Sequence, residues 1–133
     1  MSPPGILQPE GWPRPSGYSN GVLVHGRQVF IAGQVGWDPR SGKFESARLA
    51  DQAAQALRNV LAVLAQADGR PEHIARMTWY LTSRTEYIAQ LEEIGATYRQ
   101  LMGKHFPAMT AVEVTALIEP QAKVEIEATA VIP

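Results

Sequence analysis

At 133 residues, with 45% apolar and 19% charged, the chain has the size and composition of one compact globular domain. Its formal net charge of -1 gives no overall attraction to nucleic acid or to an anionic membrane surface. Cysteine is absent, which excludes disulfides, thiolate metal ligands and a cysteine nucleophile. No signal peptide or membrane helix is recognisable in the sequence. We therefore expect a cytoplasmic protein that binds neither nucleic acid nor a membrane.

The chain begins with a segment rich in proline and glycine. Residues 1–17 contain five prolines and three glycines, which remove backbone donors and favour an extended conformation over a helix. We expect an extended arm over 1–17, with Ile6, Leu7 and Trp12 as its docking residues. A single domain should then occupy 18–133.

The first half of that domain predicts a hairpin followed by a helix. The runs 21–25 and 28–32 are rich in strand-forming residues and flank the turn pair Gly26-Arg27, so they are read as a β-hairpin. A proline and glycine turn at 38–42 follows. Over 46–67 apolar residues recur at spacings of three and four, which predicts a long amphipathic helix.

The second half continues with a strand, a helix and two more strands. Residues 75–82 carry strand-forming side chains, and a second helix begins after a cap at Ser83 or Thr85 and ends near Gly103. Two C-terminal strands follow, with a turn at 119–121 between them, and they are read as a second hairpin. The order ββ-α-β-α-ββ predicts an α+β fold, a mixed sheet with both helices on one face.

Alternation in the two C-terminal strands assigns their faces. In each strand we expect one apolar face toward the core and one face that carries acids. The expected core residues are Val112, Val114 and Ala116 in the first strand and Val124, Ile126, Ala128 and Ala130 in the second. The opposite faces hold Met109, Ala111, Glu113 and Thr115, and Lys123, Glu125, Glu127 and Thr129.

The face of the sheet without helices should be covered by other copies of the chain. It is too apolar to stay wet and too acidic for a simple core, so oligomerisation is expected, with small-molecule clefts between subunits. His25, His73 and His105 lack metal-ligand spacing and are interpreted as structural. No metal or cofactor is expected.

An ordered set of short motifs resembles the RidA (YjgF, L-PSP) family over about residues 17–131. No single motif is specific, and it is their order and spacing that carry the resemblance. The motifs are Tyr18-Ser19-Asn20, Ala32-Gly33-Gln34, Asp38-Pro39, Tyr80-Leu81-Thr82, Phe106-Pro107-Ala108, Val112-Glu113-Val114 and Val124-Glu125-Ile126-Glu127-Ala128.

The resemblance implies a chorismate-mutase-like fold and a homotrimer with three clefts between subunits. It also implies hydrolysis of reactive enamines or imines without a metal or cofactor. By the same resemblance Tyr18 lines the pocket, Ala111 supplies backbone groups and Glu125 positions water as the catalytic residue. Gly33 and Trp37 are assigned to the substrate cleft.

One position departs from the family pattern in a way that bears on chemistry. Met109 stands where active members carry the arginine that anchors the substrate carboxylate, and a thioether cannot replace that bidentate cation. Losing such a charged hydrogen bond costs roughly 1.5–3 kcal/mol. Gly95 likewise stands where deaminases usually carry asparagine. Both changes argue against canonical 2-iminoacid deamination.

Two functions therefore remain open. One is a hydrolase of imines or enamines in which Glu125 guides water and Met109 and Tyr18 contact the substrate. The other is a non-catalytic trimer that binds or senses a small molecule in the same cleft. At the level of single residues, Glu125 is either an acid/base group or an ion-pair partner of Lys123, and Trp37 either stacks on a ligand or anchors its own loop. Endoribonuclease activity ranks last, because the chain has no basic run.

Overall fold

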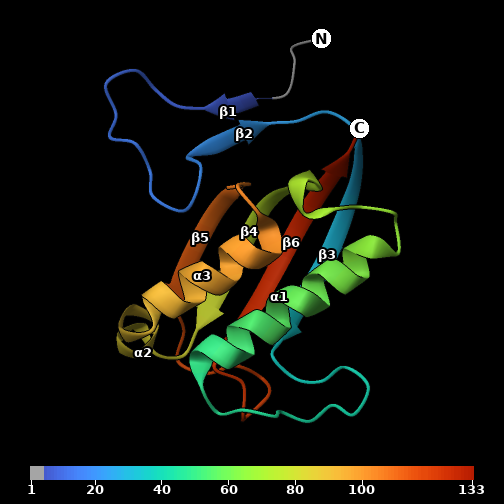
Figure 1. The fold of residues 1–133 in the computed structure, drawn as a ribbon, viewed down its shortest axis with the longest axis vertical. Helices are drawn as coiled ribbons and strands as arrows, with labels where there is room; N and C mark the ends of the chain where they lie inside the picture. Colours follow the sequence, from blue (N-terminus) through green and yellow to red (C-terminus); the bar gives the residue numbers. More distant parts are fainter. Residues whose placement is uncertain (1–4) are drawn as a thin grey trace.

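A four-stranded mixed sheet with helices on one face forms the body of the molecule (Figure 1). The computed structural model describes residues 5–133. The strand order in the sheet is β3 (Arg27–Val35), β6 (Val124–Ile132), β4 (Ile74–Leu81) and β5 (Ala108–Glu113). The helices are α1 (Leu49–Ala65), α2 (Arg84–Ala89) and α3 (Leu91–Met102), with a short 3-10 turn, η1 (Pro71–His73), before β4. The predicted α+β class is confirmed.

The helix α1 and the central strand β6 carry the core as their sequence patterns predict. Leu57, Val60 and Leu64 on α1 are fully buried against the sheet. On β6 the alternation is equally clear, since Val124, Ile126, Ala128 and Ala130 are buried while the residues between them are half-buried on the other face.

The two predicted hairpins are both wrong. The C-terminal strands β5 and β6 do not pair, because β4 lies between them, parallel to β5 and antiparallel to β6. The helical connection from β4 to β5 forces them to run parallel, and residues 114–123 then carry the chain across β4 to β6. The predicted turn does form, with the backbone N–H of Ala122 donating to the carbonyl of Glu119.

At the N-terminus, β2 (Gly21–Leu23) pairs with β1 (Gly5–Leu7) in a separate two-stranded sheet, and β3 pairs with β6 instead. Gly26 has φ of 151°, and a Cβ there would overlap the carbonyl oxygen of Ile132. The chain therefore changes direction at Gly26 against the end of β6, where a hairpin was expected. Part of the predicted arm is thus a strand, and residues 1–4 of the arm lie outside the described residues.

The face assignment of β5 is also wrong. Met109 and Ala111 lie beside Met77 and Trp79 of β4, both of which are buried under the helices. Val112, which was expected in the core, is 40% exposed on the open face. Since β5 is an edge strand with little burial on either side, the alternation of its apolar residues does not identify the core side.

The predicted second helix is divided into α2 and α3 at Gln90. Ser83 caps α2 as expected, its hydroxyl accepting from the backbone N–H of Glu86 at 3.0 Å. The break lets the side-chain oxygen of Gln90 accept from the N–H of Ala50 at 2.8 Å, and Glu86 accepts from the N–H of Leu49. Both side chains satisfy donors at the start of α1, which lacks a cap of its own.

Candidate functional site

A cavity of about 400 Å³ lies between β5 and the helices, and we call it the helix-side cavity. Three of the residues predicted for the site line it, namely Tyr18, Met109 and Ala111. Its volume falls within the range typical of small-molecule sites. These three residues therefore come together around one cavity.

Tyr18 is held at this cavity by its neighbour Ser19. The backbone N–H of Ser19 donates to the carbonyl of Pro107 at 3.0 Å, and its hydroxyl donates to the carbonyl of Phe106 at 2.5 Å. Ser19 also forms an isolated parallel bridge with Ala108 and is buried. The end of the arm is thereby fixed beside β5, one residue from the position of Met109.

Aromatic side chains that the sequence reading had not assigned to the site form the wall of the cavity. The ring centroids of Trp79 lie 6.4 Å from Tyr87 and 6.5 Å from Tyr98, and Tyr98 stacks on Phe106. Burial raises the pKa of both Tyr87 and Tyr98, so both hydroxyls stay protonated at neutral pH. The buried indole Nε1 of Trp79 has no hydrogen-bond partner within the described part of the chain, residues 5–133. The spacing of helix positions 94 and 98 signalled burial, but it could not signal a ligand.

Glu125 and Gly33 lie on the opposite face of the sheet. Glu125 is half-buried next to Tyr80 on the neighbouring strand, and its carboxylate lies over the backbone of Gly33, where a Cβ would be 2.8 Å from the carboxyl carbon. Lys123 binds Glu86 at 3.1 Å, so the predicted alternative partner of Glu125 is engaged elsewhere. Among residues 5–133, Glu125 forms no ion pair.

Glu127, a second acid on that face, already accepts a hydrogen bond. Glu127 accepts a hydrogen bond from the hydroxyl of Tyr80 at 2.7 Å, and this bond raises the pKa of Tyr80. Glu125 is thus the acid of β6 whose side chain stays available on the open face.

Trp37 belongs neither to the lining of the helix-side cavity nor to the residues around Glu125 on the open face. Its ring lies 5.9 Å from that of Phe44, and its carbonyl accepts from the side-chain amide of Asn59 at 3.0 Å. These contacts fit the interpretation in which Trp37 anchors its own loop.

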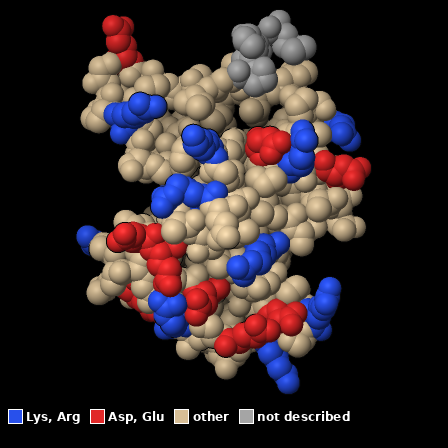
Figure 2. Space-filling view, viewed as in Figure 1, with Lys and Arg blue, Asp and Glu red and all other residues tan. Residues whose placement is uncertain are grey.

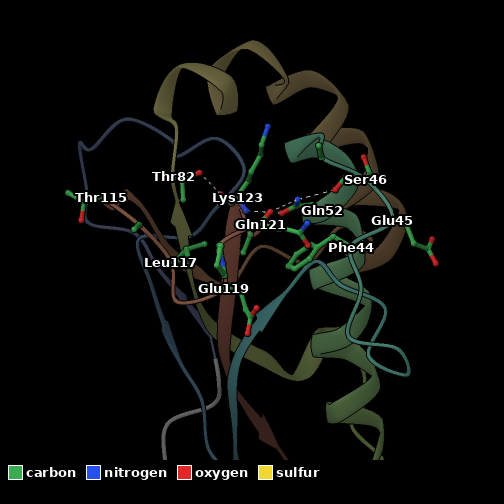
Figure 3. A pocket seen from close by; sticks show the side chains of 14 residues that line it. Phe44, Glu45, Ser46, Gln52, Thr82, Thr115, Leu117, Glu119, Gln121 and Lys123 are labelled. Carbon is green, nitrogen blue, oxygen red and sulfur yellow. Dashed lines mark hydrogen bonds between the residues drawn. The ribbon is translucent and has the colours of Figure 1, made fainter.

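A larger hollow of about 570 Å³ lies where the loop 44–47 meets residues 115–123 (Figure 3). Gln52 lines this hollow, is buried, and donates from Nε2 to the carbonyls of Ser46 and Gln121, both at 3.0 Å. Its Oε1 accepts from the N–H of Lys123 at 2.8 Å. Both N–H groups and the oxygen of this amide are thus engaged in holding the two loops together, which favours a structural role for Gln52.

The charges on the helical face are of both signs. Figure 2 shows basic and acidic side chains mixed over most of this face, with several basic groups near one another at its upper left. No group of three potential metal ligands occurs within residues 5–133. In the same range, every helix is too short or too polar to cross a membrane.

Comparison with known proteins identifies the family of this chain. The sequence profile of the Endoribonuclease L-PSP family matches residues 13–132. The chain belongs to this family, which includes the RidA and YjgF proteins. Human 2-iminobutanoate/2-iminopropanoate deaminase is 34% identical over 86% of this chain and 79% of its own length. A RutC family protein of Pyrococcus horikoshii is 33% identical over 94% and 95%.

Solved structures of Rid proteins share the fold. A Rid family protein of unknown function from Yersinia pestis superposes with a TM-score of 0.83 at 31% identity, covering 98% of this chain and all of that one. Escherichia coli TdcF, solved with bound serine, has a TM-score of 0.70 at 28% identity, covering 97% of this chain and 99% of that chain. The RidA resemblance found in the sequence is therefore confirmed.

Proposed function

We propose that this Rid family protein is a homotrimer that hydrolyses a small imine or enamine in clefts between its subunits. The observation that carries the proposal is the division of the predicted site by the sheet. Tyr18, Met109 and Ala111 lie on the helix side, whereas Glu125 and Gly33 lie on the open face. Two faces of one sheet cannot enclose one ligand, so the groups can act together only if one copy supplies each half.

The open face supports association of copies. Phe30 on β3 is 74% exposed there, beside Thr129 of β6, and no layer formed by residues 5–133 covers it. Thr78 and Tyr80 continue the face on β4, and Val112 lies on β5. Exposed apolar side chains that lie together in this way are typical of an interaction surface.

The proposed chemistry needs only water and a carboxylate. An enamine first takes a proton on carbon and loses one from nitrogen, which gives the imine. Glu125 accepts a proton from water as the water oxygen bonds to the imine carbon, and the nitrogen is protonated. The hydroxyl of the resulting carbinolamine then loses its proton and the amine nitrogen gains one as the carbon–nitrogen bond breaks, which releases ammonia and leaves a carbonyl compound.

A non-catalytic binding trimer is the second candidate, and Met109 is the observation that favours it. With a thioether in place of the family arginine, the strand no longer supplies a cation for a carboxylate substrate. In that case the same cleft would bind a small molecule without turning it over.

Ammonia release from imines generated in situ by an amino acid oxidase separates the two candidates. The hydrolase proposal predicts that the protein accelerates release and that Glu125→Gln lowers kcat at least 100-fold. Glu127→Gln is the matched control, since it changes the next acid on the same face of the same strand and should keep most activity. If no imine is turned over while a ligand raises the melting temperature, the binding trimer replaces the hydrolase.

A further inference from the structure

Among residues 5–133, one cation lines the helix-side cavity and forms no ion pair with an acidic side chain. Arg99 extends from α3 and contributes to the same lining as Met109 and Tyr18. Within residues 5–133 the ion pairs of arginine involve Arg48 and Arg70, and the ion pair of lysine involves Lys123. Arg99 is exposed, so its charge is hydrated until a ligand displaces the water.

Gly95 makes room for this guanidinium. It lies one helical turn before Arg99, and a Cβ built on it would be 3.3 Å from Nη1 of Arg99. The guanidinium therefore lies back over the glycine, toward the start of α3, as helical side chains tend to do. A larger residue at position 95 would compete for the space that Arg99 occupies.

We propose that Arg99 is the carboxylate anchor of this protein, replacing from the helix the cation that the strand lacks at Met109. The inference rests on the proposed function only in using the same cleft. A guanidinium offers paired N–H donors that match a carboxylate, and neither Met109 nor Ala111 supplies a competing charge.

The rest of the cavity specifies what the carboxylate is attached to. Trp79, Tyr87, Ile94 and Tyr98 present mainly apolar surface. The free Nε1–H of Trp79 is a donor left for a polar atom of a ligand or for a water molecule. A volume near 400 Å³ holds about a dozen non-hydrogen atoms, taking the ~30 Å³ that a water molecule occupies as the measure. The expected ligand class is a 2-imino or 2-oxo acid with a large apolar or aromatic side chain.

Binding of stable analogues tests this without any need for turnover. Phenylpyruvate, its neutral amide and pyruvate are titrated calorimetrically against the trimer. We expect phenylpyruvate to bind at least 10-fold more tightly than either of the others. Arg99→Gln should weaken phenylpyruvate binding about 10- to 100-fold and leave the amide unchanged. Arg99→Lys should retain part of the affinity.

Two further variants test whether the effect depends on where the positive charge lies. Arg14→Gln removes a cation from an adjacent hollow that shares Tyr18 but not Met109, and it should leave phenylpyruvate binding unchanged. Met109→Arg in the Arg99→Gln background should restore affinity by returning a cation to the strand.

The outcomes of this inference and of the hydrolase proposal are separable. Equal affinity of wild type and Arg99→Gln for phenylpyruvate overturns the anchor, even if imines are hydrolysed. A loss of affinity confined to the carboxylate ligand upholds the anchor, even if no ammonia is released.

Discussion

Gly33→Ala is predicted to damage catalysis while leaving the fold almost intact. A Cβ at position 33 would overlap Oε2 of Glu125 and would lie 2.8 Å from its carboxyl carbon and 2.9 Å from its Cγ. The obstacle is the end of a flexible side chain, so the carboxylate can rotate away. The rotamer change costs on the order of 0.5–1.5 kcal/mol, which sets the expected loss of stability.

The effect on rate should be much larger. To regain ordinary van der Waals contact the carboxylate oxygen must move by about 1 Å, and a displacement of that size can cost roughly 100-fold in rate. We expect kcat for imine hydrolysis to fall by about that factor, with the midpoint of urea unfolding little changed. Ammonia release and urea denaturation measure the two quantities.

A double-mutant cycle isolates the contact. In the Glu125→Ala background, Gly33→Ala should have no further effect on kcat, because the carboxylate that it displaces is already gone. The reasoning is refuted if Gly33→Ala leaves kcat unchanged in the wild-type background, or if it lowers kcat equally with and without Glu125.

Three further predictions concern side chains that support the fold or the site. Burial raises the pKa of Tyr98 above its unfolded value near 10. The contribution of this hydroxyl to stability is therefore fully present below pH 10 and is lost above it, as the unfolded chain ionises first. Tyr98→Phe should make the alkaline decline in melting temperature shallower. Gln52→Leu removes three hydrogen bonds and should lower the free energy of unfolding by about 3 kcal/mol in urea titrations, and a loss below about 1 kcal/mol would contradict the structural role of that amide. Ser19→Ala removes the hydroxyl bond to Phe106 but keeps the backbone bond to Pro107, so it loosens the support of Tyr18 and should raise KM more than it lowers kcat, whereas unchanged kinetics would show that Tyr18 does not need this hydroxyl.

The sequence predicted the elements of the fold better than their pairing. The periodicity of α1 and the alternation on β6 are signals of burial, and both elements are buried as predicted. Pairing depends on contacts between distant segments, and neither predicted hairpin forms. The pair Gly26-Arg27 is typical of a hairpin loop. In the structure the glycine is required because the backbone at position 26 lies so close to the carbonyl oxygen of Ile132 that a Cβ would overlap it.

The candidate site was predicted in part for the same reason. Motif positions found Tyr18, Met109 and Ala111, which do line one cavity. The sequence could not show that Glu125 lies across the sheet from them, because the face of an edge strand such as β5 is set by its parallel partner. Arg99 gave no signal at all, since an exposed helical arginine is ordinarily solvated.

Complementation between two inactive variants tests most directly whether each cleft takes its two halves from different copies. Glu125→Gln impairs the half on the open face, and Met109→Glu places a repelling acid in the helix-side cavity. If the two chains are coexpressed in equal amounts, about three quarters of cyclic trimers are mixed, and each mixed trimer contains one cleft with both halves intact. The account predicts recovery of about one quarter of wild-type imine hydrolysis, and mixed trimers no more active than the separate variants would contradict it.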